Sequence, residues 1–246
     1  MTFSPSPVLR ASAVGTVLVA LTLAAAGCAS TPEVSESTTL AAAQSSVATI
    51  SAVAAVSAVG EVAALAIAGR QERDAARLVE AAERMLDIRS RERLLPGQSG
   101  DPEGPGSLDP AALLLEAEAT GTVDAALAER IAAVRGRLPD PTLEAPGRGG
   151  GAERGPQRYS ASVAGRANRR HELSFDGPAP AVIQVRGSGA TNLDVYHFDV
   201  NGDRVAAEGG PSDVATVHLY VPFTQTLTLV VRNRGNRSNA YYVITN

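Results

Sequence analysis

The sequence predicts an α+β protein in which an alanine-rich helical hairpin or small bundle precedes an antiparallel, jelly-roll-like β-sandwich. Three observations lead to this fold class. Good helix formers dominate residues 40–138, a Gly/Pro-rich linker fills residues 139–157, and short β-rich runs separated by turn residues fill residues 158–246. The helical and β-rich segments therefore follow one another along the chain.

The N-terminal residues 1–27 read as a secretory signal. Arg10 precedes an apolar run over residues 14–26, and Cys28, the single cysteine of the chain, follows directly. The run is too short for a membrane span, which needs about 20 apolar residues. An ordinary signal peptide cut near Ala24 to Ala26, with an incidental cysteine, is the alternative.

The sequence Leu23-Ala24-Ala25-Ala26-Gly27-Cys28 resembles the lipobox of bacterial lipoproteins. The resemblance implies acylation of Cys28 (palmitate among the chains), a membrane anchor and a place in the bacterial cell envelope. Ala29, where Asp would favour retention at the inner membrane, favours the outer membrane. Residues 28–39, rich in Ser, Thr and Glu, are expected to form a flexible tether.

The helical region 40–138 begins with residues 37–60, which carry no charge. Polar Ser, Thr and Gln recur through them, which favours a packed or oligomerising helix, with a membrane-embedded segment as the alternative. Small residues at Ala52, Val56, Gly60 and Ala64 predict a close helix–helix contact. An unbroken helix over 40–95 would form a stalk of about 80 Å, with Gly60 and Gly69 as the expected break points.

The remaining helices follow from apolar stripes and caps. Residues 70–93 are amphipathic, and residues 96–109 are expected to form a loop that ends at a cap, Asp109-Pro110. A second pair of helical stretches then covers 111–119 and 123–138 around a Thr120-Gly121-Thr122 interruption. The two stripes are Leu78, Val79, Ala82, Met85 and Leu86, and Leu127, Ile131, Val134 and Leu138.

Seven β-rich runs predict the strands of the sandwich. Val217, Leu219 and Val221 alternate with polar neighbours, as half-buried strands do. The predicted strands are 159–163, 170–175, 181–186, 193–200, 214–221, 227–232 and 240–244.

The β-rich region also resembles the bacterial pre-peptidase C-terminal domain. The resemblance is carried by 193–199, Asn201-Gly202, 217–221, 227–231 and 240–244. It implies a small jelly-roll-like sandwich with a binding, solubility or secretion role and without a catalytic motif. Thr224-Gln225-Thr226 replaces the usual Gly-Thr-Tyr entry into the penultimate strand, which leaves a generic sandwich open.

A calcium loop is one interpretation of the acidic residues after residue 193. Asp199, Asn201 and Asp203 have the alternate spacing of opening calcium ligands, and Asp194 can add an oxygen from the same strand. Gly202 falls at the wrong position for such a loop, and Asn-Gly is a strong hairpin signal. A hairpin turn is therefore the favoured prediction, with calcium as the alternative and no other cofactor expected.

Arginines gather before two strands of the predicted sandwich. Arg232, Arg234 and Arg237 precede the last strand. If the sandwich brings them beside the second group (Arg166, Arg169 and Arg170), they can grip carboxylates or phosphates bidentately. A solvated surface is the favoured interpretation, and an anion-binding patch is the alternative.

No residue pattern predicts catalysis. His171, His197 and His218 share no motif and are expected on solvated strand faces. Gly187-Ser188-Gly189 lacks the spacing of a nucleophile elbow, and Glu116 and Glu118 point to different sides of a helix. We therefore expect a protein that is not an enzyme.

The overall charge and the expected architecture point to envelope partners. A net charge of −4 argues against nucleic acid. The sequence thus predicts an envelope lipoprotein whose sandwich binds an envelope protein or polymer and whose helices form a stalk or oligomerisation region, so a homo-oligomer is one expectation. An accessory subunit of a secreted hydrolase or export complex is the alternative.

Overall fold

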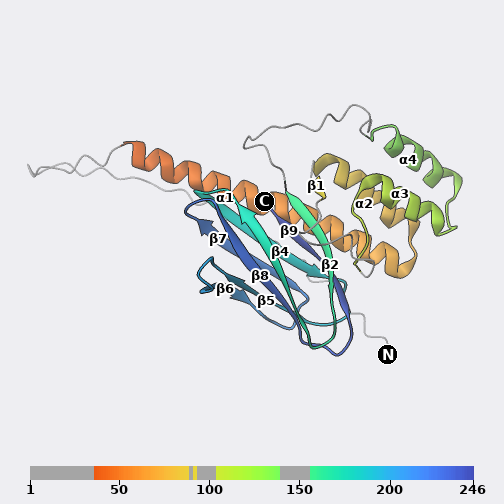
Figure 1. Cartoon of the computed structure of the whole chain (residues 1–246). Coiled ribbons are helices and arrows are strands. Elements are labelled where there is room, and N and C mark those ends of the chain that lie inside the picture. The colour runs from red at the N-terminus through yellow and green to blue at the C-terminus, as the bar shows by residue number, and fades with distance from the viewer. Residues whose placement is uncertain (1–35, 89–90, 93–103, 139–155) are drawn as a thin grey trace, which may run out of the picture.

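The computed structural model describes residues 36–88, 91–92, 104–138 and 156–246, with the backbone alone for 36–49 and 91–92. The predicted signal, Cys28 and Ala29 lie outside the described residues, as does most of the predicted 139–157 linker. The described chain confirms the predicted fold class, with four helices followed by a two-sheet β-sandwich (Figure 1).

Four α-helices form two hairpins: α1 Glu36–Glu72, α2 Ala75–Ile88, α3 Pro110–Ala119 and α4 Ala125–Arg135. The chain turns between α1 and α2 at Arg73, whose φ is 53°, and Asp74 caps α2 by accepting from the Arg77 N–H at 3.2 Å. A single helix over 40–95 is therefore wrong, and the break lies at neither Gly60 nor Gly69. The break at Arg73 could not be predicted from the sequence, because a residue other than glycine rarely adopts a positive φ.

The second hairpin follows its sequence signals. Asp109 caps α3 through the N–H groups of residues 111 and 112, with Pro110 at the first helical position, and Asp124 caps α4 through the N–H of residue 127. Gly121, at φ 75°, makes the turn between them. Buried side chains on both hairpins match the predicted stripes: Leu78, Val79, Ala82, Met85, Leu127, Ile131 and Val134.

Two sheets form the sandwich, and each has one strand that the sequence did not predict. The five-stranded sheet has the order β1-β2-β9-β4-β7, and the four-stranded sheet has the order β3-β8-β5-β6. All pairings are antiparallel except β1 with β2. The bounds are β1 Arg91–Glu92, β2 Gln157–Val163, β3 Asn168–Phe175, β4 Ala179–Gly187, β5 Leu193–Phe198, β6 Arg204–Glu208, β7 Val214–Val221, β8 Gln225–Asn233 and β9 Asn239–Thr245; β1 and β6 are the unpredicted pair.

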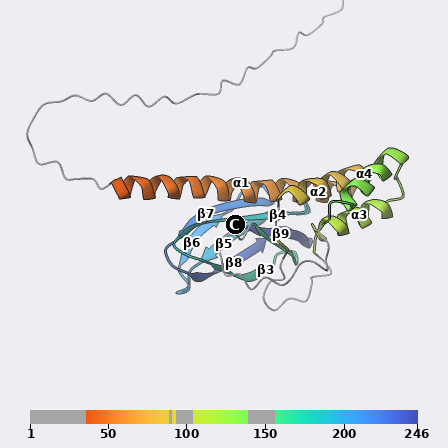
Figure 2. The ribbon, with the colours of Figure 1, turned by 90° about the horizontal axis from the view of Figure 1, so that it is seen from above.

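α1 forms a third layer on the outer face of the five-stranded sheet, while α2 packs on α1, and α3 and α4 pack on α2 (Figures 1 and 2). α1 lies along β4 and also reaches β9, as Figures 1 and 2 show together. Val182, Tyr242 and Ile244 on that face belong to the same apolar core as the helices, whereas a second core fills the space between the two sheets. β4 and β9 are therefore covered on both faces, which explains their long apolar runs.

The small residues of α1 were predicted to form a close contact with another helix. Part of that contact is instead with the sheet. Gly60 sits directly over β4, since a Cβ placed on it would lie 1.9 Å from Oε1 of Gln184. Gly69 serves the helical hairpin, because its Cβ would lie 3.0 Å from the side chain of Leu78. Two glycines of one helix thus face two different partners, and both are needed for close approach.

The apolar character of α1 has a packing explanation. Among the described residues, Ile50–Glu72 is one stretch that is long and apolar enough to cross a membrane, with a mean hydropathy of 2.0. Core helices pass the same test of length and composition. This stretch supplies five buried core residues, Val56, Val59, Val62, Ala63 and Ala66.

Arg70 ties the helices to the sandwich. Its guanidinium donates to Glu116 on α3 (2.6 and 3.1 Å), to the hydroxyl of Tyr242 on β9 (2.8 Å) and to the carbonyls of Pro105 and Ser107 (2.8 and 2.5 Å). Three parts of the chain that are distant in sequence, α1, residues 105–116 and β9, therefore meet at one cation, which favours a single arrangement of helices on sheet.

Candidate binding surfaces of the sandwich

In the described ranges no helix packs on the outer face of the four-stranded sheet, which we call the open face. Its register places residues in rows across β3, β8, β5 and β6. The three rows are Asn168–Arg232–Asp194, Arg170–Val230–Tyr196–Ala207 and Glu172–Thr228–Phe198–Arg204. Half-buried Tyr196 and Phe198 thus lie among charged side chains, a mixture suited to recognition of an amphipathic or anionic partner.

Both arginine groups meet at one end of the sandwich, which we call the arginine end. The loop between β2 and β3 packs on the loop between β8 and β9, where the N–H of Arg166 donates to the carbonyl of Gly235 at 2.8 Å. A Cβ on Gly165 would lie 2.8 Å from the nitrogen of Arg237, so these loops touch through backbone. Topology therefore brings together residues that are about 70 positions apart in sequence.

The arginines differ in whether they are already engaged. Arg234 pairs with the Asp194 carboxylate, which is 1% exposed, and this contact raises the pKa of Arg234. Arg169 donates to the carbonyl of Ser162 at 2.7 Å. Arg170 donates to Thr228 Oγ1 at 2.9 Å. Arg166, Arg232 and Arg237 are exposed and have no polar side-chain partner in the described structure, so they are the arginines available to a ligand.

Two buried asparagines, which the sequence did not single out, hold the loops of the arginine end. Asn233 is 1% exposed; its amide oxygen accepts from Thr191 Oγ1 (2.7 Å) and the Gly235 N–H (2.9 Å), and its nitrogen donates to the carbonyls of Val163 (3.2 Å) and Arg237 (2.7 Å). Asparagine is common in loops, and only the tertiary contacts distinguish this one.

Asn239 completes the same network. It is fully buried, accepts from the N–H and hydroxyl of Ser188 (both 3.1 Å) and donates to the carbonyl of Thr191 at 2.8 Å. The loop between β4 and β5 is thereby fixed to the loops that carry the arginines. A rigid loop cluster loses little conformational entropy when it binds.

The predicted hairpin at Asn201-Gly202 is confirmed. Asp199 accepts from the N–H groups of Asn201 and Asp203, both at 2.9 Å, and these bonds, with that of Asp203 largest, lower the pKa of Asp199. Gly202 takes the positive φ of 86° that the turn requires. The carboxylate thus serves the turn between β5 and β6.

Asp194 lies apart from the other three candidate calcium ligands, which share one turn. Asp194 is engaged by Arg234, away from the turn that holds Asp199, Asn201 and Asp203. In the described ranges, no group of three or more His, Cys, Asp or Glu side chains is arranged to hold a metal ion.

Two histidines that were expected on solvated faces are buried. His171 and His197 are 4% and 0% exposed and lie between the sheets, whereas His218 is exposed as expected. His171 shares a 2.5 Å hydrogen bond with the hydroxyl of Tyr241, and both ring nitrogens of His197 lack a partner. Burial lowers the pKa of each to about 4, so both are neutral at pH 7.

Residues considered for catalysis have structural partners. Ser188 donates to Asn239 at 3.1 Å, Glu116 pairs with Arg70, and Glu118 pairs with Arg135 at 3.0 Å. These contacts tie the hydroxyl and both carboxylates into the fold and form no acid/base pair.

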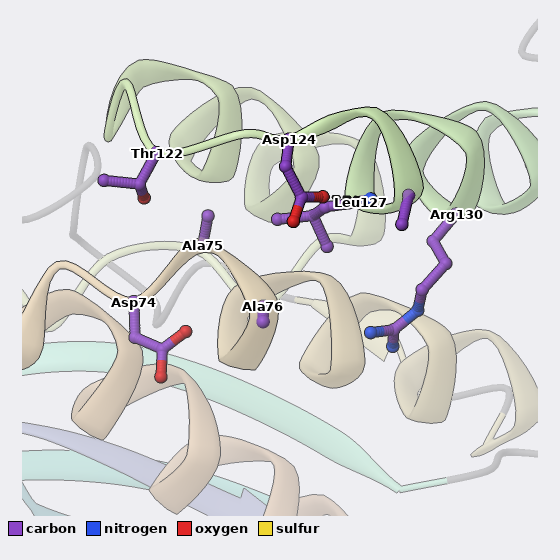
Figure 3. A pocket seen from close by; sticks show the side chains of 8 residues that line it. Asp74, Ala75, Ala76, Thr122, Asp124, Leu127 and Arg130 are labelled. Atoms are coloured by element: carbon purple, nitrogen blue, oxygen red, sulfur yellow. Dashed lines mark hydrogen bonds between the residues drawn. The ribbon is translucent and has the colours of Figure 1, made fainter.

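A pocket of about 310 Å³ lies between the start of α2 and the start of α4 (Figure 3). Asp74, Thr122, Asp124 and Arg130 line it, but both aspartates cap helices, and Arg130 pairs with Glu83 at 2.8 Å. The polar groups of this pocket therefore stabilise the helical layer.

Comparisons with known proteins do not assign the chain to a family. No family model matches it, and no curated protein matches it. Solved structures similar to part of it include a periplasmic inhibitor of g-type lysozyme from Aeromonas hydrophila (11% identity, 37% of this chain, 84% of the other, TM-score 0.30). Others are the pre-peptidase C-terminal domain of a Bacillus anthracis collagenase (11% identity, 37% and 76%, TM-score 0.24) and a carbohydrate-binding module of Cellvibrio mixtus lichenase 5A (11% identity, 33% and 74%, TM-score 0.23). Similarities at this level carry no argument about what the chain binds.

Proposed function

We propose that this chain is a non-enzymatic bacterial envelope lipoprotein that binds an anionic envelope component through the arginine end and the adjoining open face. The observation that carries the proposal is the asymmetry of the sandwich. Helices cover one sheet, while the other sheet is open and ends at exposed Arg232 and Arg237 on loops fixed by Asn233 and Asn239. Guanidinium groups on a rigid support suit carboxylate or phosphate groups.

The anchor in this proposal is the lipid on Cys28, supported by the lipobox-like sequence alone. Ala29 favours the outer membrane. Mass spectrometry of the N-terminal peptide from the membrane fraction tests the anchor: a diacylglyceryl-modified Cys28 is expected, and Cys28→Ser should leave the membrane fraction. An unmodified cysteine would refute the anchor.

Charge reversal tests the binding surface. Full-length Arg232→Glu/Arg237→Glu should lose most of its co-sedimentation with isolated envelope sacculi, and the loss should resemble the effect of raising salt on the wild type. Arg84→Glu, at an exposed pair on α2, is the matched control and should bind normally. Equal binding by the double variant and the control would refute the arginine end as the binding site.

A truncated chain that ends at Gln157 would not test the binding surface cleanly. α1 shares its core with β4 and β9, so removing the sandwich would expose that core. Point variants on the surface keep the two layers together and separate binding from folding.

A further inference from the structure

Exposed apolar side chains gather at one end of the molecule. Six large apolar side chains are exposed in the described ranges, and five of them share the end opposite to the arginine end. The sixth, Leu115, lies on α3 and is 64% exposed. We call the five residues the apolar tip: Ile50 (69% exposed), Val200 (61%), Val205 (46%), Tyr220 (62%) and Phe223 (58%).

Strand topology brings the sandwich residues of the tip together. A Cβ on Gly177, in the loop between β3 and β4, would lie 2.5–2.6 Å from the backbone of Phe223, so the β3–β4 and β7–β8 loops touch. Phe198 at the end of β5 pairs with Thr228 near the start of β8, which places the Val200 turn at the same end. Both figures show β6, β7 and the start of α1 at one end (Figures 1 and 2).

α1 carries Ile50 to this end because it runs alongside β4. Gly60 lies over Gln184, and further along α1 the Gln71 side chain donates to the carbonyl of Ser188 at 2.6 Å, so the two elements run in the same direction. Ile50 precedes Gly60 by about 15 Å of helix, and Ala179 precedes Gln184 by about 16 Å of strand. Ala179 pairs with Val221, so Ile50 is level with the end of β7.

The chain before α1 keeps the proposed anchor close to this end. Seven residues lie between Cys28 and Glu36, and the eight Cα–Cα steps that join the two cannot span more than about 28 Å. The sequence of α1 then contains no charged residue between Glu36 and Glu61. The part of α1 that follows Glu36 can therefore enter the headgroup region without the cost of removing a charge from water.

We propose that the apolar tip rests in the interfacial layer of the bilayer to which the chain is tethered. The proposal depends on the anchor of the proposed function, because the lipid on Cys28 supplies the local concentration of membrane. Tyr220 and Phe223 are suited to the boundary between headgroups and acyl chains. The arginine end then points away from this membrane, toward the envelope component that it binds.

The charges near the tip indicate what kind of membrane contact this is. Asp176, Asp199 and Asp203 outnumber Arg204, so the tip carries no excess of positive charge. The contact is therefore apolar, and neither anionic lipid nor low salt should strengthen it.

Tryptophan reporters test the contact, since the chain contains no tryptophan. Full-length Phe223→Trp and the matched control Leu115→Trp, both at exposed positions, are purified in acylated form and reconstituted on phosphatidylcholine vesicles that contain brominated acyl chains. We expect the fluorescence of Phe223→Trp to be quenched several-fold more than that of Leu115→Trp, without enhancement by phosphatidylglycerol. Equal quenching at the two positions would overturn the proposal.

Three further measurements distinguish the possible causes of each outcome. Tyr220→Trp provides a second reporter at the tip if Phe223→Trp fails to fold. Shielding of Phe223→Trp from acrylamide that grows with protein concentration without lipid would assign the tip to a second copy and overturn the membrane contact. The mass of the Cys28 peptide is measured on the same samples, so an acylated but unquenched protein refutes the tip alone, whereas an unacylated protein refutes the anchor.

Discussion

At the scale of residues, the structure places polar side chains where the sequence did not expect them. His171 and His197 lie between the sheets with a pKa of about 4, lowered by burial. Alternation alone indicates which residues share a face, but a histidine fits the polar or the apolar face of a strand. The neighbours that bury the histidine ring in the fold therefore decide whether it is protonated.

The buried histidines predict a stability that falls in mild acid. Unfolded histidines bind protons below pH 6.5 while the folded ones do not until about pH 4, so stability is lost as pH falls through this window. Each histidine should contribute a loss of about 2 kcal/mol in the free energy of unfolding between pH 7 and pH 5. Urea denaturation at the two pH values measures it.

Histidine variants assign that loss. His197→Leu should remove about half of the pH dependence of stability, because His197 is one of the two buried histidines. The substitution breaks no hydrogen bond, since neither ring nitrogen has a partner in the described structure. His218→Gln, at an exposed position, should leave the dependence unchanged. A wild-type slope that His197→Leu does not alter would contradict the assignment.

Asn233 predicts a large local effect from a small substitution. Asn233→Ala removes four hydrogen bonds and leaves buried donors and acceptors unsatisfied, which should cost about 3 kcal/mol in the free energy of unfolding. Exposed Asn236→Ala in the same loop should cost less than about 0.5 kcal/mol. Similar midpoints for the two variants in denaturant titrations would show that the network does not hold the loops.

At the scale of elements, the sequence of α1 predicted least about its own packing, yet α1 is the helix on which both the sheet and α2 pack. α1 carries no charge over residues 37–60 and lacks a distinct apolar stripe, so the sequence alone left membrane, oligomer and core open. The reason for its composition is that both the sheet and α2 pack on it, at Gly60 and Gly69 respectively. A helix with partners on two sides needs small residues on two sides.

Gly60 predicts how closely α1 must approach β4. Gly60→Leu would force its side chain into Gln184, which is 7% exposed and bonded to Thr216, and should cost about 2 kcal/mol in unfolding free energy. Ala54→Leu on the exposed side of α1 should be nearly neutral. Gln184→Ala should restore part of the stability of Gly60→Leu in a double-mutant cycle, and additive costs would contradict the contact.

At the scale of the whole molecule, the helices and the sandwich share a core and are joined at Arg70. We therefore expect one cooperative unfolding transition, in which helical circular dichroism and tyrosine fluorescence change together. Arg70→Ala should lower the free energy of unfolding by about 3 kcal/mol and separate the two signals, because Glu116 loses its partner. Arg77→Ala, at an exposed pair, is the control. Two separate transitions in the wild type would contradict a shared core.

The sequence by itself determined the order of most elements, the cap at Asp109, the hairpin at Asn201-Gly202 and the alternation of β7, because each depends on neighbours within a few residues. Short β6, with no buried apolar pattern, was missed. The helical layer on β4, the meeting of the arginine loops and the burial of His197 were decided by tertiary structure alone. They depend on contacts between residues far apart in the chain, and the free energy of such contacts is set by what packs on each face rather than by local preference.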